Sequence, residues 1–200
     1  SQKSAGGAAD RVHGKNSQAS PTPITDGKHI FVHFGTRGTA ALTTKGEIVW
    51  KNQELKYAPV HGNGGSPILV GDNLVMSCDG GDVDFIAAIN KNTGKLAWKT
   101  DRTDSSIRKK FAFGTPLLIE VDGKQQIVSQ ASGYVYSYDT KGELIWKVNY
   151  NGGYSVIPRP VFAHGLVFVS SSYDSAVLYA IDPSGEGDVT DSHVKWTLTK

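Results

Sequence analysis

The chain has 200 residues, of which 38% are hydrophobic and 20% charged, and its formal net charge is +2. This composition is that of a globular chain long enough to bury a core, and it excludes a disordered one. The basic residues are scattered along the chain, so neither nucleic acid nor an anionic membrane surface is indicated as a partner.

No apolar run approaches the roughly 20 residues that cross a bilayer, so no direct membrane span is expected. The single cysteine, Cys78, cannot form an internal disulfide. It ends an apolar segment and is expected to be a small buried side chain. The 23 glycines, together with many Ser, Asn and Asp residues, indicate frequent tight turns and therefore an all-β chain.

In chain order, residues 1–18 are polar and small, which predicts a flexible arm or the end of a preceding loop. Four similar units follow, over about residues 19–53, 65–100, 113–148 and 158–199. Each has a proline near its start, a turn rich in Gly and Asp, and four short apolar or alternating segments. These features predict four antiparallel strands per unit, joined by hairpins. Helix is expected to be nearly absent, because no long segment has helical apolar spacing.

One tryptophan closes each unit, and the four recur at intervals of 48, 48 and 50 residues. A four-stranded sheet of this size cannot bury its faces alone, so the units must stack as the blades of a β-propeller. A large ring at a fixed place can bury surface against the next blade. A small residue in each unit is expected to leave room for it. The tryptophans and small residues are Trp50, Trp98, Trp146 and Trp196, and Ala41, Ala88, Ser137 and Ala180.

The segment Ala-Ile-Asn-Lys-Asn-Thr-Gly-Lys-Leu-Ala-Trp at 88–98 resembles the tryptophan-docking motif AxDxxTGKxxW of pyrroloquinoline-quinone-like (PQQ-like) repeats. The turn glycines Gly46, Gly94 and Gly142 fit the same motif, and the motif's Asp is matched by Asp139 and Asp182, which are expected to cap turns. WD40 and Kelch repeats fit less well, because their own markers do not recur at fixed points.

This resemblance covers about residues 19–199 and implies a ring of seven or eight blades. The four blades present are therefore expected to form an open arc from such a ring. The remaining blades of the same protein would cover its two ends, and an uncovered arc is expected to pair end to end or aggregate.

The loops at one end of a propeller channel are where binding is expected. His61 and Asn63 lie in a glycine-rich loop before an inner strand, and Arg159 opens the inner strand of the fourth unit. All three are ligand-binding candidates, although local backbone bonding by His61 and Asn63 and an exposed salt bridge by Arg159 are the competing interpretations.

Asp79, Asp82 and Asp84 are the metal candidates, because calcium uses oxygen-rich glycine loops, but a solvated acidic turn competes. The same alternatives hold for acidic residues in the longer connection of the fourth unit. Four basic residues fall in the second blade-to-blade loop and could receive an anion. These two sets are Glu186, Asp188 and Asp191, and Arg102, Arg108, Lys109 and Lys110.

No catalytic residue is nominated, because no nucleophile, metal or nucleotide motif is present. The resemblance implies a non-catalytic interaction platform similar to periplasmic or otherwise extracytoplasmic PQQ-like repeat proteins, including the BamB-like lipoprotein of outer-membrane protein assembly. Its partner would be a protein or small ligand held by channel-end loops, with no cofactor. The alternative is part of a quinoprotein dehydrogenase that oxidises alcohols or sugars with PQQ and calcium. Against that alternative, a single cysteine cannot form a vicinal disulfide, and the repeat uses all four tryptophans.

Overall fold

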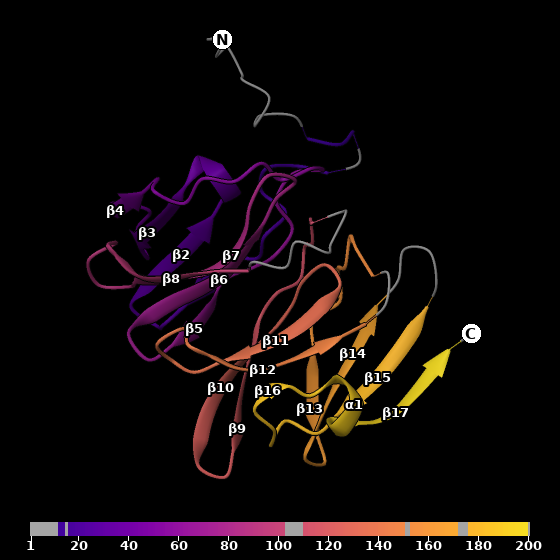
Figure 1. Ribbon diagram of the computed structural model, residues 1–200. Helices are drawn as coiled ribbons and strands as arrows, with labels where there is room; N and C mark the ends of the chain where they lie inside the picture. The colour runs from indigo at the N-terminus through magenta and orange to yellow at the C-terminus, as the bar shows by residue number, and fades with distance from the viewer. Residues whose placement is uncertain (1–11, 15, 103–109, 151–152, 172–175, 200) are drawn as a thin grey trace.

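The computed structural model describes residues 12–14, 16–102, 110–150, 153–171 and 176–199. Four antiparallel sheets follow one another in chain order around an arc, from indigo to yellow in Figure 1. Consecutive hairpins make each sheet, and each sheet is one propeller blade. Within these described ranges no sheet closes on itself. The expected all-β arc of four propeller blades is confirmed.

The strands of blades 1 and 2 are β1 (Ile24–Thr25), β2 (His29–His33), β3 (Thr39–Thr43), β4 (Ile48–Asn52), β5 (Ile68–Val70), β6 (Asn73–Asp79), β7 (Asp84–Asn90) and β8 (Leu96–Asp101). Those of blades 3 and 4 are β9 (Leu117–Val121), β10 (Lys124–Gln130), β11 (Tyr134–Tyr138), β12 (Leu144–Asn149), β13 (Val161–Ala163), β14 (Leu166–Ser171), β15 (Val177–Ile181) and β17 (Val194–Thr199).

Helix is limited, among the described residues, to the 3₁₀ turn η2 (Gly35–Arg37) and the single turn α1 (Thr190–His193). No described helix has the length and apolar character needed to cross a membrane.

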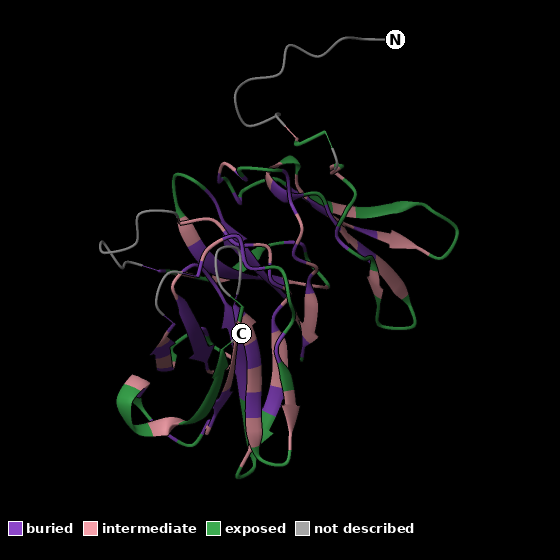
Figure 2. Cartoon of the chain, turned by 90° about the vertical axis from the view of Figure 1, so that its right-hand side faces the viewer, coloured by how far each residue is buried: buried purple, intermediate pink, exposed green. Residues whose placement is uncertain are grey.

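The core lies between the blades. One buried cluster joins blades 1 and 2, a second joins blades 2 and 3, and a third joins blades 3 and 4. The central strands β7 and β11 are buried along most of their length, whereas β4 and β17 are mostly exposed. Figure 2 colours the chain by burial, with buried segments in purple and exposed ones in green. Cys78 is buried in the first cluster, as a small hydrophobic side chain would be.

Two of the tryptophans lie against the turn of the following blade. Trp50 Nε1 donates to the Lys91 carbonyl at 2.8 Å, and Trp98 Nε1 donates to the Thr140 carbonyl at 3.1 Å. A Cβ placed on Gly94 would lie 2.7 Å from the Trp50 ring, and one on Gly142 would lie 2.5 Å from the Trp98 ring. Any larger residue at these glycines would therefore have to displace the indole. We call this contact the Trp–Gly joint.

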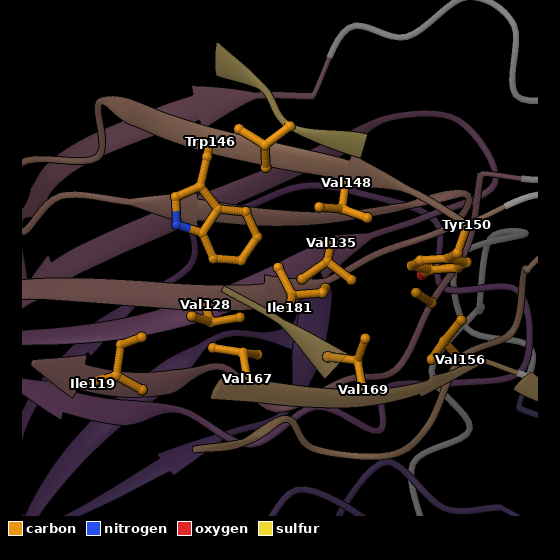
Figure 3. Packing of buried hydrophobic residues seen from close by; sticks show 12 residues of the cluster. Ile119, Val128, Val135, Trp146, Val148, Tyr150, Val156, Val167, Val169 and Ile181 are labelled. Carbon is orange, nitrogen blue, oxygen red and sulfur yellow. The ribbon is translucent and has the colours of Figure 1, made fainter. Parts of the chain in front are cut away.

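The third joint is built differently. Trp146 Nε1 donates 2.9 Å to Gln126 Oε1 of its own blade, and Gln126 Nε2 donates 3.1 Å to the Pro183 carbonyl of blade 4. The glutamine therefore connects the indole to the next blade. Figure 3 shows Trp146 among valine and isoleucine side chains of blades 3 and 4, where it is fully buried.

The longer connection of the fourth unit explains that burial. Its strand β16 (Gly187–Asp188) pairs in parallel with β12, so that Trp146 lies opposite Gly187. Turn α1 follows and returns the chain to β17. The sequence predicts only a loop here, but the insertion adds a fifth strand to blade 3.

The two ends of the arc hold unused halves of the joint. A Cβ added to Gly46 of blade 1 would meet no described atom within 4 Å, and Trp196 of blade 4 is 45% exposed. The outer face of blade 1 also forms an apolar cavity of about 270 Å³ whose lining includes Val32 and Leu42. Both end blades thus present surface of the kind that inner blades bury.

A polar network lies inside blade 1. His33 is buried on β2, its Nδ1 is 2.9 Å from Thr39 Oγ1, and its Nε2 is 3.4 Å from the Tyr57 hydroxyl. Burial lowers the pKa of His33 to about 4. The imidazole is therefore neutral in the folded protein at physiological pH.

We expect Gly94→Ala to destabilise the protein more than Gly46→Ala. Both glycines have positive φ, +72° and +84°, so alanine costs about 1 kcal/mol at either site. At Gly94 the new Cβ also meets the Trp50 ring, which adds about 2 kcal/mol of overpacking. Urea unfolding of the two variants measures the difference, and equal losses would contradict the joint.

Protonation of His33 should weaken the fold as the pH falls. Between pH 6.5 and about 4 the unfolded chain binds a proton that the folded protein does not, so the free energy of unfolding should fall by about 3 kcal/mol across this window. His33→Gln removes this contribution. The stability difference between wild type and variant should therefore narrow by that amount from pH 7 to pH 4, and a pH-independent difference would show that His33 titrates normally.

Candidate functional site

Four chain segments lead into the inner strands β1, β5, β9 and β13, and each has a proline at its end. Bonds between neighbouring segments tie them together. The Thr22 N–H donates to Ser66 Oγ at 2.8 Å, and the Ser66 N–H donates to Thr115 Oγ1 at 3.0 Å. The fourth residue of the series is Arg159, which has no acceptor atom in its side chain. We call these four residues before the prolines the belt.

The belt lines a cavity of about 530 Å³. Apolar residues of the inner strands, including Ile24, Ile68 and Leu118, line the rest of it. Arg159 is exposed and is the one charged residue in this lining. The structure therefore places this predicted candidate in the channel, where its charge is not opposed by any carboxylate of the lining.

A second cavity of about 530 Å³ lies at the entrance to the same segments, and we call it the mouth. Four of its lining residues, Ser20, Gly64, Phe113 and Ile157, come two positions before the belt residues. The mouth is lined by His13, Asn16, Ser20, His61, Gly64, Phe113, Ser155 and Ile157. The mouth and the belt thus lie at successive positions along the same four segments.

Aromatic rings form the wall of the mouth. The His61 ring stacks on Phe113 with centroids 6.1 Å apart and meets His13 and Phe111 edge-on, each at 5.5 Å. Phe111 in turn meets Tyr154 edge-on at 5.7 Å. Of the three ligand candidates, His61 therefore lies at the mouth with its side chain exposed.

The N-terminal segment contributes to this wall. The His13 N–H and Asn16 Nδ2 both donate to the His61 carbonyl, at 3.2 and 2.8 Å. The sequence predicts a flexible arm over residues 1–18. The parts of it that the structure describes, residues 12–14 and 16–18, include side chains that pack on the mouth, and residues 1–11 and 15 lie outside the described part of the chain.

Asn63 does not line the mouth. It is 4% exposed, and its Oδ1 accepts a hydrogen bond of 2.8 Å from the Tyr57 hydroxyl. Tyr57 connects it to His33 in the interior of blade 1. Asn63 therefore lies apart from His61, and its predicted role in binding stays a prediction.

The three carboxylates proposed for a metal occupy separate environments. Asp79 is buried and paired with Arg102, whose Nη1 lies 2.6 Å from Asp79 Oδ2. Asp82 Oδ1 accepts from the Ala58 N–H at 2.8 Å. Burial, with repulsion from Asp79 second, raises the pKa of Asp84 to about 8. Among the residues described, no group of three or more acidic, His or Cys side chains is placed to hold a metal ion, so we assign none to this loop.

Arg102 departs from the expectation of an exposed loop cation. It is buried between blades 2 and 3, donates to Ser129 Oγ at 2.5 Å and to the Tyr138 hydroxyl at 3.2 Å, and lies over the Tyr136 ring. The pair with Asp79 satisfies both charges, so neither is available to a ligand.

The other basic and acidic candidates give no common site. Arg108 and Lys109 fall outside the described residues, and Lys110 is half-buried beyond them. In the fourth unit, Asp188 Oδ1 accepts from the Thr190 N–H and hydroxyl, a local turn contact. Glu186 and Asp191 are exposed.

Sequence reasoning misses most of the mouth and belt. It does not predict a role for Phe113, Ile157 or the hydroxyl residues Thr22, Ser66 and Thr115. The signal is present, because superimposing the four units on their prolines brings the belt positions into one column and shows a single arginine among hydroxyl residues.

Comparison with known proteins shows which family and which solved structures this chain is similar to. The family model described as outer membrane protein assembly factor BamB matches residues 10–108 and 84–199. A search of curated proteins finds no match.

Solved structures of low sequence identity share the fold. Quinohemoprotein alcohol dehydrogenase from Comamonas testosteroni matches with a TM-score of 0.65 at 16% identity, over 95% of this chain and 35% of its own. BamB from Moraxella catarrhalis matches with a TM-score of 0.60 at 17% identity, over 82% and 49%. A europium-containing methanol dehydrogenase gives 0.63 at 16% identity, over 88% and 40%.

This chain therefore spans between about a third and a half of the length of these structures, and the likeness to them is one of fold. The two matches of the family model together cover every residue from 10 to 199, and the repeated blades with their closing tryptophans agree with it. The chain belongs to the PQQ-like repeat family represented by the outer membrane protein assembly factor BamB.

Proposed function

We propose that this chain is part of a non-catalytic, extracytoplasmic binding platform, and that its mouth is the binding site. The observation that carries the proposal is the set of rings, His13, His61 and Phe113, that lines a cavity of about 530 Å³ at the blade-to-blade connections, with Phe111 in edge-on contact with His61. The family's association with outer-membrane protein assembly supports a protein partner and a compartment outside the cytoplasm.

The mouth suits an apolar or aromatic group. Ile157, a lining residue, is 69% exposed, and the mutually stacked Phe113 and His61 rings also line the mouth, where a planar group can pack against them. Concave sites lined by aromatic side chains with a few polar groups are the usual form of a binding pocket. The partner is therefore a protein segment that presents an aromatic side chain at the channel entrance.

The mouth also rests on a rigid base. The backbone of the segment after Phe111 is tied to the fourth blade, because the Phe113 N–H donates to the Val156 carbonyl at 2.7 Å and the Ser155 N–H donates to the Phe111 carbonyl at 3.0 Å. A wall whose backbone is already fixed loses little entropy on binding.

The structural likeness to quinoprotein alcohol dehydrogenases supports a second candidate, in which the full ring holds PQQ and calcium. The described residues do not fit these groups well. Asp79 is committed to Arg102 between two blades, and Trp50, Trp98 and Trp146 are committed to the joints. We therefore derive no reaction step for this chain.

The mouth can be tested with blocked tripeptides. A Gly-Trp-Gly peptide with acetyl and amide ends should shift the backbone NMR signals of residues 61, 113 and 157, whereas Gly-Ala-Gly should not. His61→Asn should weaken the binding of the tryptophan peptide by about fivefold, because a ring contact worth about 1 kcal/mol is lost. His164→Asn is the matched control, since His164 lies in the turn between β13 and β14 and outside the mouth lining.

Equal effects of the two histidine variants, or peptide signals scattered over the surface, would contradict a site at the mouth. The competing function is tested separately. PQQ and Ca²⁺ are added to the protein, and the dye-coupled oxidation of alcohols and aldose sugars is followed. Turnover in that assay would refute the non-catalytic proposal.

A further inference from the structure

The belt contains an interruption that the rest of the repeat does not explain. In two successive blades the N–H of the belt residue donates to the hydroxyl of the next blade, from Thr22 to Ser66 and from Ser66 to Thr115. The next bond in the series would run from the Thr115 N–H to position 159. The Arg159 side chain can only donate, so the series ends there, at a cavity that Thr115 and Arg159 both line.

The cavity around this interruption is cationic. Its lining consists of hydroxyl and apolar residues with one charge, that of Arg159, which is exposed to the cavity. None of the lining residues is acidic. An acceptor that carries negative charge is what this lining lacks, because it would pair with the guanidinium and could also accept from the Thr115 N–H.

The depth of the channel adds a second requirement. Two residues before Thr115 and Arg159 come Phe113 and Ile157 of the mouth. A ligand that reaches Arg159 from the mouth passes these side chains, so an apolar or aromatic body one level above the charge would be buried against them.

We propose that the belt is a carboxylate-binding subsite, and that the ligand of this channel carries an aromatic or apolar body with a carboxylate at one end. The proposal rests on the mouth being the entrance used, and it adds the anionic group that the mouth alone does not require. The carboxylate can belong to a small molecule or to the C-terminus of a peptide, since both offer the same two oxygens to the guanidinium.

The test uses phenylacetate and its neutral analogue phenylacetamide, titrated into the full chain and followed by NMR. Wild type should bind phenylacetate about tenfold more tightly, as one charge-assisted contact provides. Arg159→Thr should abolish that preference, because it lowers the affinity for phenylacetate far more than the affinity for phenylacetamide. Threonine is the residue found at the matching positions 22 and 115, so this variant can restore the missing hydrogen bond and should melt no lower than wild type.

Arg37→Thr is the matched control. It removes the same charge from the η2 turn, at the outer face of blade 1, and should keep the preference for phenylacetate. Raising the salt concentration should reduce the preference in wild type and in this control, because the charge at Arg159 is reachable by solvent.

The source of the carboxylate is distinguished by a second pair of probes, Gly-Phe with a free C-terminus and Gly-Phe amide, both with acetylated N-termini. A preference for the free acid that exceeds that for phenylacetate indicates a peptide, and the reverse order indicates a small molecule. Either order supports the subsite if Arg159→Thr removes the preference for the free acid. Equal binding of acid and amide, or a preference that survives Arg159→Thr, overturns it.

Failure of the subsite and failure of the mouth give different results. Binding of phenylacetamide with no preference for the acid keeps the mouth and rejects the belt. Binding of acetate at Arg159 without any gain from the phenyl ring keeps the belt and rejects the aromatic mouth.

Discussion

The contact between a tryptophan ring and the glycine of the next blade is the constraint on which this structure depends. No blade can bury both of its faces, so each must find its neighbour at a fixed distance and angle. At Gly94 and Gly142 the indole lies where a Cβ would otherwise be, and its N–H is satisfied by a carbonyl of the same turn. At the third joint the Trp146 ring is also covered and its N–H is also satisfied, but by different groups. Gln126 accepts the indole N–H, and β16 covers the ring. What the fold requires is therefore a covered ring and a satisfied N–H, and not a particular partner.

The Trp–Gly joints lie at the outer strands, but they also determine how the segments that lead into the inner strands are placed. Once the outer strands are set, the segments leading into β1, β5, β9 and β13 converge, and residues that are 44 or 49 positions apart share one level. Hydroxyl groups at that level bind the neighbouring backbone. A change of one belt residue thus alters the chemistry of the channel while the joints keep the blades in place. Arg159 is such a change.

The sequence was sufficient for the features that repeat. The period, the four strands of each unit, the turns and the closing tryptophans are local patterns, and the structure has them. The sequence was insufficient wherever the position of a side chain depends on a partner that is far away along the chain. Arg102 follows a strand as a loop residue would, and its burial depends on Asp79, Ser129 and Tyr138 from two blades. Asn63 and His61 are two residues apart, but their side chains lie in different environments. The Tyr57 hydroxyl donates to Asn63 in the interior, whereas the exposed His61 ring stacks on Phe113. The pairing of β16 with β12 joins an insertion to another blade. The sequence of the insertion alone does not predict this pairing.

The division between residues that hold the fold and residues that remain for binding follows from this organisation. Three tryptophans, two turn glycines and two belt hydroxyls are engaged in contacts between blades, namely Trp50, Trp98, Trp146, Gly94, Gly142, Ser66 and Thr115. The imidazole of His61 and the guanidinium of Arg159 belong to neither the joints nor the belt hydrogen bonds, and both face cavities. At position 159 the fold itself favours a hydroxyl, because that residue would accept the Thr115 N–H as its counterparts do in the preceding blades. The arginine found there cannot make that side-chain hydrogen bond, and it adds a charge to the cavity. Residues that a fold would not select are commonly found where stability has been exchanged for function, and Arg159 at this position supports the proposal that the belt is a binding subsite.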